Sequence, residues 1–97
     1  MQTETRVTTT SGEVYLKKLC RHFAHKVPAT LIGDQGIIDF PFGRCRMLAT
    51  SDHMRLSIEV TNAQEVASAE RVVTDHLVRM ARGSNLDVQW VRTGARR

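Results

Sequence analysis

Long apolar segments are missing from this chain of 97 residues. A helix needs about 20 consecutive apolar residues to cross a membrane, and the apolar patch at residues 29–32 is far shorter. The chain starts with the polar segment MQTETRV, which lacks the apolar run of a signal peptide. We therefore expect a cytoplasmic protein that does not associate with membranes.

Cysteine is scarce as well, with occurrences at Cys20 and Cys45. Two cysteines are too few for a disulfide framework, and in a reducing compartment we expect both to be free thiols. Both stand at positions expected to face inward, where a buried cysteine behaves as a small apolar residue. We therefore predict that neither thiol is catalytic.

Linkers, repeats and catalytic motifs are also absent. No segment is rich enough in proline, glycine or serine to separate two domains. We predict a single domain over residues 1–97, with an ordered core over about 5–92 and a flexible basic tail over 93–97. The segments GDQG and PFG are turns, because neither follows a parallel strand and opens a helix as phosphate loops do. Without paired carboxylates, a GxSxG motif or a zinc signature, the sequence does not support an enzyme.

Alternating and helical patterns are present, and they predict the element order β-α-β-β-β-β-α-β. We expect strands at residues 5–10, 27–32, 37–40, 44–49, 54–60 and 86–91, and helices at residues 11–26 and 62–82. Two capping boxes should start the helices, Thr10 with Glu13 and Asn62 with Glu65. Pro28 and Gly83 should end them.

These elements indicate an α+β fold. Both helices are amphipathic, and the clearest strand alternates apolar and polar residues over 54–60. An antiparallel sheet with one apolar face and two helices packs best as a two-layer sandwich, with both helices on the same face of the sheet. The other face is then left to solvent or to a ligand.

The first helix, YLKKLCRHFAHKVP, carries much of the basic charge of a chain whose net charge is +4 and whose pI is near 9.7. On a helical wheel its apolar residues share one arc. Arg21, His22 and His25 lie on the opposite arc, and Lys26 lies near the boundary. Cations near the last turn of a helix also favour its dipole, which explains part of this charge without any ligand.

A metal ion is one interpretation of the two histidines. His22 and His25 lie about 60° apart on a helix and could share an ion, whereas Cys20 lies about 160° from His22 and could not join them. A tetrahedral zinc site needs two more ligands, and His53, His76 and Cys45 show no motif spacing that places them there. We expect no other cofactor.

The segments YLKKLCRHFAHKVP, GIIDFPFGRCRM, AQEVASAERVVTDHLVRMA and LDVQW together resemble a bacterial family, domain of unknown function 2218, over about residues 5–90. The resemblance implies a small bacterial domain that is free-standing or joined to siderophore-interacting flavin reductases. It therefore implies a link to iron acquisition, and it transfers no catalytic residue. His22, His25 and Lys26 are the matching residues that packing does not explain.

We accordingly predict an accessory binding domain for an anionic small molecule or a siderophore-related reductase. The expected binding residues are Arg21, His22, His25, Lys26, Arg44 and Arg46. A nucleic-acid-binding protein and a homo-oligomeric interaction protein, such as a homodimer, are the alternatives. Nucleic acid is less favoured, because aromatic pairs for base stacking and a basic recognition helix are missing.

Overall fold

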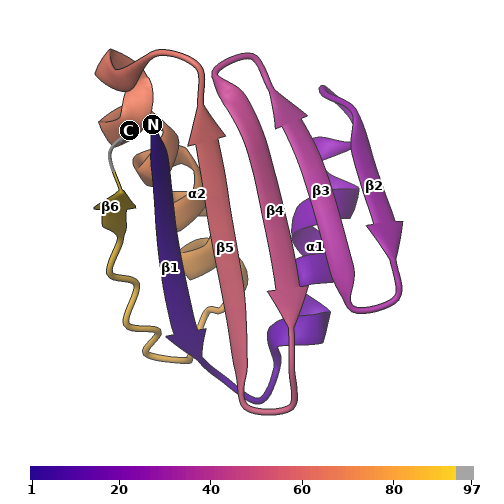
Figure 1. The fold of residues 1–97 in the computed structure, drawn as a ribbon. Helices are drawn as coiled ribbons and strands as arrows, with labels where there is room; N and C mark the ends of the chain where they lie inside the picture. The colour runs from indigo at the N-terminus through magenta and orange to yellow at the C-terminus, as the bar shows by residue number, and fades with distance from the viewer. Residues whose placement is uncertain (94–97) are drawn as a thin grey trace.

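A six-stranded antiparallel sheet forms one layer of the protein in a computed structural model, which describes residues 1–93 (Figure 1). The order across the sheet is β2-β3-β4-β5-β1-β6. The strands β2 to β5 therefore form the predicted meander, and β1 lies between β5 and the last strand. The strands are β1 (Gln2–Thr8), β2 (Ala29–Ile32), β3 (Gln35–Phe40), β4 (Gly43–Ala49), β5 (His53–Val60) and β6 (Val91–Thr93).

Two helices form the second layer, and both cover the same face of the sheet (Figure 1). The helix α1 (Gly12–Phe23) packs against β2, β3 and β4, and α2 (Val66–Met80) packs against β5 and β1. Between the layers, the alternation of β5 buries Met54, Leu56 and Ile58. The predicted α+β sandwich and element order are therefore confirmed. Within residues 1–93, no helix has the length and apolarity that crossing a membrane requires.

The start of each helix differs in how it is capped. Asn62 caps the second helical segment, since its Oδ1 accepts a hydrogen bond from the Gln64 N–H at 2.9 Å, and a short 3-10 turn, η1 (Ala63–Glu65), precedes α2. The predicted capping box is only half formed, because within residues 1–93 the Glu65 side chain makes no cap bond in return. The capping box of Thr10 and Glu13 is wrong. Ser11 is the N-cap of α1 and makes no side-chain bond, while Glu13 forms an ion pair with Lys17 at 3.0 Å.

The end of α1 also comes earlier than the sequence suggested. The helix ends at Phe23, not at Lys26, and the N–H groups of Lys26 and Val27 both donate to the Phe23 carbonyl in a tight turn. Pro28 prevents the helix from continuing beyond this turn, because it has no N–H to donate to the Ala24 carbonyl and its ring disfavours helical geometry at Val27. Similarly, α2 ends at Met80 rather than at residue 82.

The last predicted strand exists, but its bounds of residues 86–91 are wrong, because β6 comprises only Val91–Thr93. Side chains of the preceding segment still pack on the core, and the Trp90 Nε1–H donates to Thr74 Oγ1 at 2.7 Å. The backbone of residues 86–90 does not pair with β1, whose pairing with β6 begins at Val91. Thr93 is part of β6, so the tail does not begin there. The rest of the predicted tail lies outside the described residues.

Glu70 of α2 connects the helix layer to β1 and β6 through hydrogen bonds. Its carboxylate accepts a hydrogen bond from Thr3 Oγ1 at 2.6 Å and two from Arg92, at 2.8 and 3.0 Å. The hydrogen bonds from Arg92 and Thr3 keep the pKa of Glu70 below its usual value, although partial burial opposes this.

We expect Glu70→Gln to lower the free energy of unfolding by about 1.5–3 kcal/mol at pH 7, the range for hydrogen bonds to a charged group. The stabilisation by Glu70 is present above the unfolded-state pKa and is lost as the pH falls through the lower folded-state pKa. Urea unfolding at pH 7 and at pH 3 measures both effects. A penalty as large at pH 3 as at pH 7 would contradict this account.

Candidate functional site

Two histidines from different helices meet at the surface of the helix layer. The rings of His22 on α1 and His76 on α2 lie with their centroids 5.0 Å apart, and each ring also lies against the ring of Phe23. Helical spacing predicted His25, not His76, as the neighbour of His22. The sequence did contain one indication that His76 lies near another element. His76 borders the apolar stripe of α2, and a residue at that position faces the element that packs beside the stripe.

The hydrogen bond of His76 defines its tautomer. Its Nδ1 lies 2.7 Å from the carbonyl oxygen of Val72. A carbonyl only accepts hydrogen bonds, so Nδ1 carries a proton and donates it. The opposite nitrogen, Nε2, then has the free lone pair of the neutral ring and can accept a hydrogen bond.

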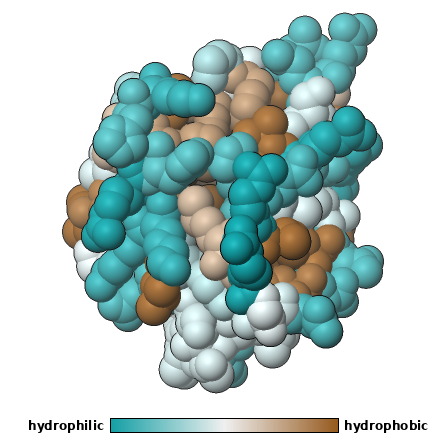
Figure 2. All heavy atoms as spheres, turned by 180° about the vertical axis from the view of Figure 1, so that it is seen from behind, coloured by the Kyte–Doolittle hydropathy of each residue, from teal (hydrophilic) through white to brown (hydrophobic). Residues whose placement is uncertain are grey.

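The charges that lower the pKa of His22 come from basic side chains. Desolvation lowers its pKa, and the charges of His76, Lys26, His25 and Arg79 lower it further. We call these five residues, His22, His25, Lys26, His76 and Arg79, the cationic cluster. The ion pairs found within residues 1–93 involve other side chains. Figure 2 shows this side of the molecule, on which hydrophilic side chains project over the helices and leave smaller apolar patches between them.

The structure adds no further ligand to the metal site predicted at His22 and His25, within residues 1–93. In the part of the chain that the structure describes, no three histidine, cysteine or acidic side chains are grouped so that they could hold a metal ion. His22 and His25 therefore lack further protein ligands among residues 1–93. Cys20 and Cys45 are buried, and burial raises the pKa of both thiols, that of Cys45 to about 12. A protonated buried thiol is a poor nucleophile and a poor ligand.

The other predicted binding residues lie elsewhere. Arg21 lines a groove of about 250 Å³ between α1 and β2, together with Lys17. Arg44 and Arg46 lie on the open face of the sheet, because Cys45 between them points toward the helices. The six residues therefore do not form a single site, because Arg44 and Arg46 lie on the opposite face of the sheet from the residues of α1 and the turn that follows it. Strand alternation around Cys45 was sufficient to separate the two arginines from the histidines.

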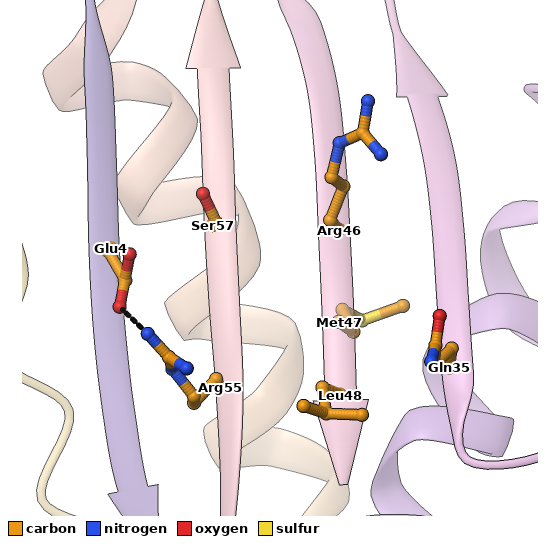
Figure 3. A pocket seen from close by; sticks show the side chains of 7 residues that line it. All are labelled: Glu4, Gln35, Arg46, Met47, Leu48, Arg55 and Ser57. Atoms are coloured by element: carbon orange, nitrogen blue, oxygen red, sulfur yellow. Dashed lines mark hydrogen bonds and ion pairs between the residues drawn. The ribbon is translucent and has the colours of Figure 1, made fainter.

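The open face contains a shallow hollow of about 250 Å³ with Arg46 on one side (Figure 3). The other arginine of the hollow, Arg55, forms an ion pair with Glu4, with 2.8 Å between Nη2 and Oε2. Arg44 nearby forms an ion pair with Asp39, with 2.6 Å between Nε and Oδ1. Arg46 forms no ion pair within residues 1–93. The hollow is lined by Glu4, Gln35, Arg46, Met47, Leu48, Arg55 and Ser57.

The fold and these surfaces define a small α+β domain with one open sheet face and a cationic helix layer. The chain belongs to the bacterial family described as "uncharacterized protein conserved in bacteria (DUF2218)", whose model matches residues 4–91. The resemblance found in the sequence is thereby confirmed. A protein of Pseudomonas aeruginosa with an NMR structure, PA4090, is 33% identical, with a TM-score of 0.78 over 93% of this chain and 94% of that chain. A comparison with curated proteins finds no match.

Proposed function

We propose that this protein is an accessory binding domain whose cationic cluster takes an anion with two or more negative charges. The observation that supports this most directly is the meeting of the His22 and His76 rings at 5.0 Å on the surface of the helix layer, with Lys26 and Arg79 close enough to act on His22. Lys26 and Arg79 carry positive charge at neutral pH, and a histidine adds a charge when it is protonated. An anion bound among these groups relieves the repulsion between their like charges.

The side chains of the cationic cluster indicate which anions it would bind. Lysine and arginine attract carboxylates and phosphates, and a protonated imidazole adds a directional donor whose charge depends on pH. Ferric siderophore complexes that carry carboxylates belong to this class of ligand. The link to siderophore-interacting reductases that the family resemblance implies makes them the first candidates.

An NMR titration tests the proposal, with the imidazole signals of His22, His25 and His76 as the readout. The probes are sulfate, citrate and gallium citrate, a diamagnetic substitute for ferric citrate. We expect shifts that are confined to the cationic cluster. Lys26→Ala should weaken sulfate binding about two- to fivefold, as expected for an exposed ion pair worth about 0.5–1 kcal/mol.

Arg46→Ala is the matched control, because it removes the same charge from the opposite face of the molecule. Equal weakening by both variants would mean that the net charge alone attracts the anion and would overturn the proposal. Binding of DNA at low salt that is lost at high salt, with no response to sulfate or citrate, would favour the nucleic-acid alternative.

The pH dependence of anion binding follows from the lowered pKa of His22. Because the pKa of His22 is lower in the folded state, protonation of His22 destabilises the fold. The stability that neutral His22 contributes is fully present above the unfolded-state pKa of about 6.5, and it is lost as the pH falls through the lower folded-state pKa. A bound anion favours the protonated ring and raises that pKa. Sulfate stays doubly charged over this range, so we expect it to bind more tightly at pH 5.5 than at pH 7.5, and the double variant His22→Ala with His25→Ala to reduce that difference.

A further inference from the structure

The edge strand β2 is open to a further strand. It ends the order of the sheet, and its four residues, Ala29–Ile32, carry no charge. Leu31 is 42% exposed and Ile32 is 73% exposed. Natural edge strands are commonly protected by charged residues, prolines or bulges, and β2 has none of these within its length. The opposite edge, β6, has Arg92 in the middle of its three residues.

The backbone of β2 offers free hydrogen-bonding groups. The Asp39 N–H donates to the Pro28 carbonyl at 2.9 Å, so Pro28 and Asp39 form a hydrogen-bonded pair. Hydrogen-bonded pairs alternate along antiparallel strands, so the backbone groups of Thr30 and Ile32 face β3. The N–H and C=O groups of Ala29 and Leu31 consequently point away from the sheet.

Two hollows flank this edge, one on each face of the sheet. The groove on the helix side contains Leu31 together with Lys17 and Arg21 of α1 and has a volume of about 250 Å³. The hollow on the open face contains Ile32 and Ile37 and has a volume of about 350 Å³. Side chains of an added strand alternate between the two faces, so successive residues would enter the two hollows in turn.

The lining of the hollows indicates the chemistry of the added strand. Lys17 and Arg21 favour acidic side chains on the helix side, although Glu13 already neutralises part of the Lys17 charge. On the open face, Ile32 and Ile37 favour apolar side chains, and Asp34 at the rim disfavours acids. A second copy of this chain paired through β2 would bring its own Lys17 and Arg21 close to these cations, which like-charge repulsion opposes.

We propose that β2 binds an extended peptide segment in which acidic and apolar residues alternate, and that the segment adds as a seventh strand. The probe is an end-blocked eight-residue peptide of alternating glutamate and valine, and the control peptide has lysine in place of glutamate. Hydrogen exchange of the backbone amides is the readout. We expect the Ala29 and Leu31 amides to become protected with the glutamate peptide and to stay unprotected with the lysine peptide.

Leu31→Pro removes an outward N–H group without removing a hydrogen bond to β3, so it should abolish the peptide effect. Leu31→Ala keeps the N–H group and should retain the effect. Arg21→Glu serves as a second variant and reverses the charge at the helix-side groove. We expect the lysine peptide to protect the Ala29 and Leu31 amides of this variant better than the glutamate peptide does. Lys26→Ala, in the cationic cluster, should leave the peptide effect unchanged, which separates this inference from the proposed function.

Several results would overturn the inference. Equal protection by both peptides, or protection confined to the cationic cluster, would show that acidic residues are not selected at β2. Protection of Leu31 without peptide, together with concentration-dependent sedimentation, would show that a second copy occupies the edge. No protection at millimolar peptide would show that β2 does not accept this class of partner.

Discussion

Gly43→Ala should remove much or all of the stability of the fold. Gly43 begins β4 with φ of +153°, and a Cβ atom there would lie 2.0 Å from the Glu59 carbonyl oxygen and 3.0 Å from the Val60 Cα atom. These atoms belong to the backbone of β5, which is paired on both sides and cannot move aside. Strain and overpacking each cost about 1–3 kcal/mol, so we expect a loss of roughly 2–6 kcal/mol. Small domains have only about 5–15 kcal/mol in total.

Gly33→Ala is the matched control for this change. Gly33 also has a positive φ, of 60°, but apart from its chain neighbours no atom of residues 1–93 lies within 4 Å of the Cβ position. Gly33→Ala therefore shows the cost of the backbone conformation alone, about 1–2 kcal/mol. Urea unfolding of both variants measures the difference, and a loss for Gly43→Ala no larger than that for Gly33→Ala would contradict the backbone contact.

Leu16→Ala should have the second largest effect. Leu16 is fully buried in α1, and its Cδ2 atom lies 3.3 Å from the position where a Cβ of Gly36 would stand, so the helix packs closely on β3. A buried Leu→Ala substitution costs about 2–5 kcal/mol, because the cavity that it leaves closes only in part. In a domain of this size that loss lowers Tm by about 8 °C or more.

The control for Leu16→Ala is Val14→Ala on the same helix, where the side chain is 51% exposed. A surface substitution of this kind changes stability by about 0.5 kcal/mol or less. Thermal unfolding followed by circular dichroism compares the two variants. Similar Tm values would mean that α1 contributes little to the core, and the proposed binding surfaces that depend on its position would then lose their support.

Local patterns predicted the parts of this fold whose burial is decided within one segment. Met54, Leu56 and Ile58 are buried because alternation places them on one face of a strand, and this holds in any sheet that covers that face. The Asn62 cap also held, since it needs only the backbone two residues ahead. The prediction of a strand around Trp90 was wrong. Alternating burial also fits an irregular segment whose side chains pack on the core, as that of Trp90 does, while its backbone pairs with no other strand.

The candidate binding surfaces show the same division. The sequence by itself determined the fold class, the family and the basic character of α1, because composition, spacing and local pairing are properties of contiguous residues. Only the tertiary structure brought His76 and Arg79 to His22, separated Arg46 from them and left β2 at an open edge. These outcomes depend on which elements become neighbours, and that choice is made by the packing of the whole core, in which residues more than 50 positions apart meet.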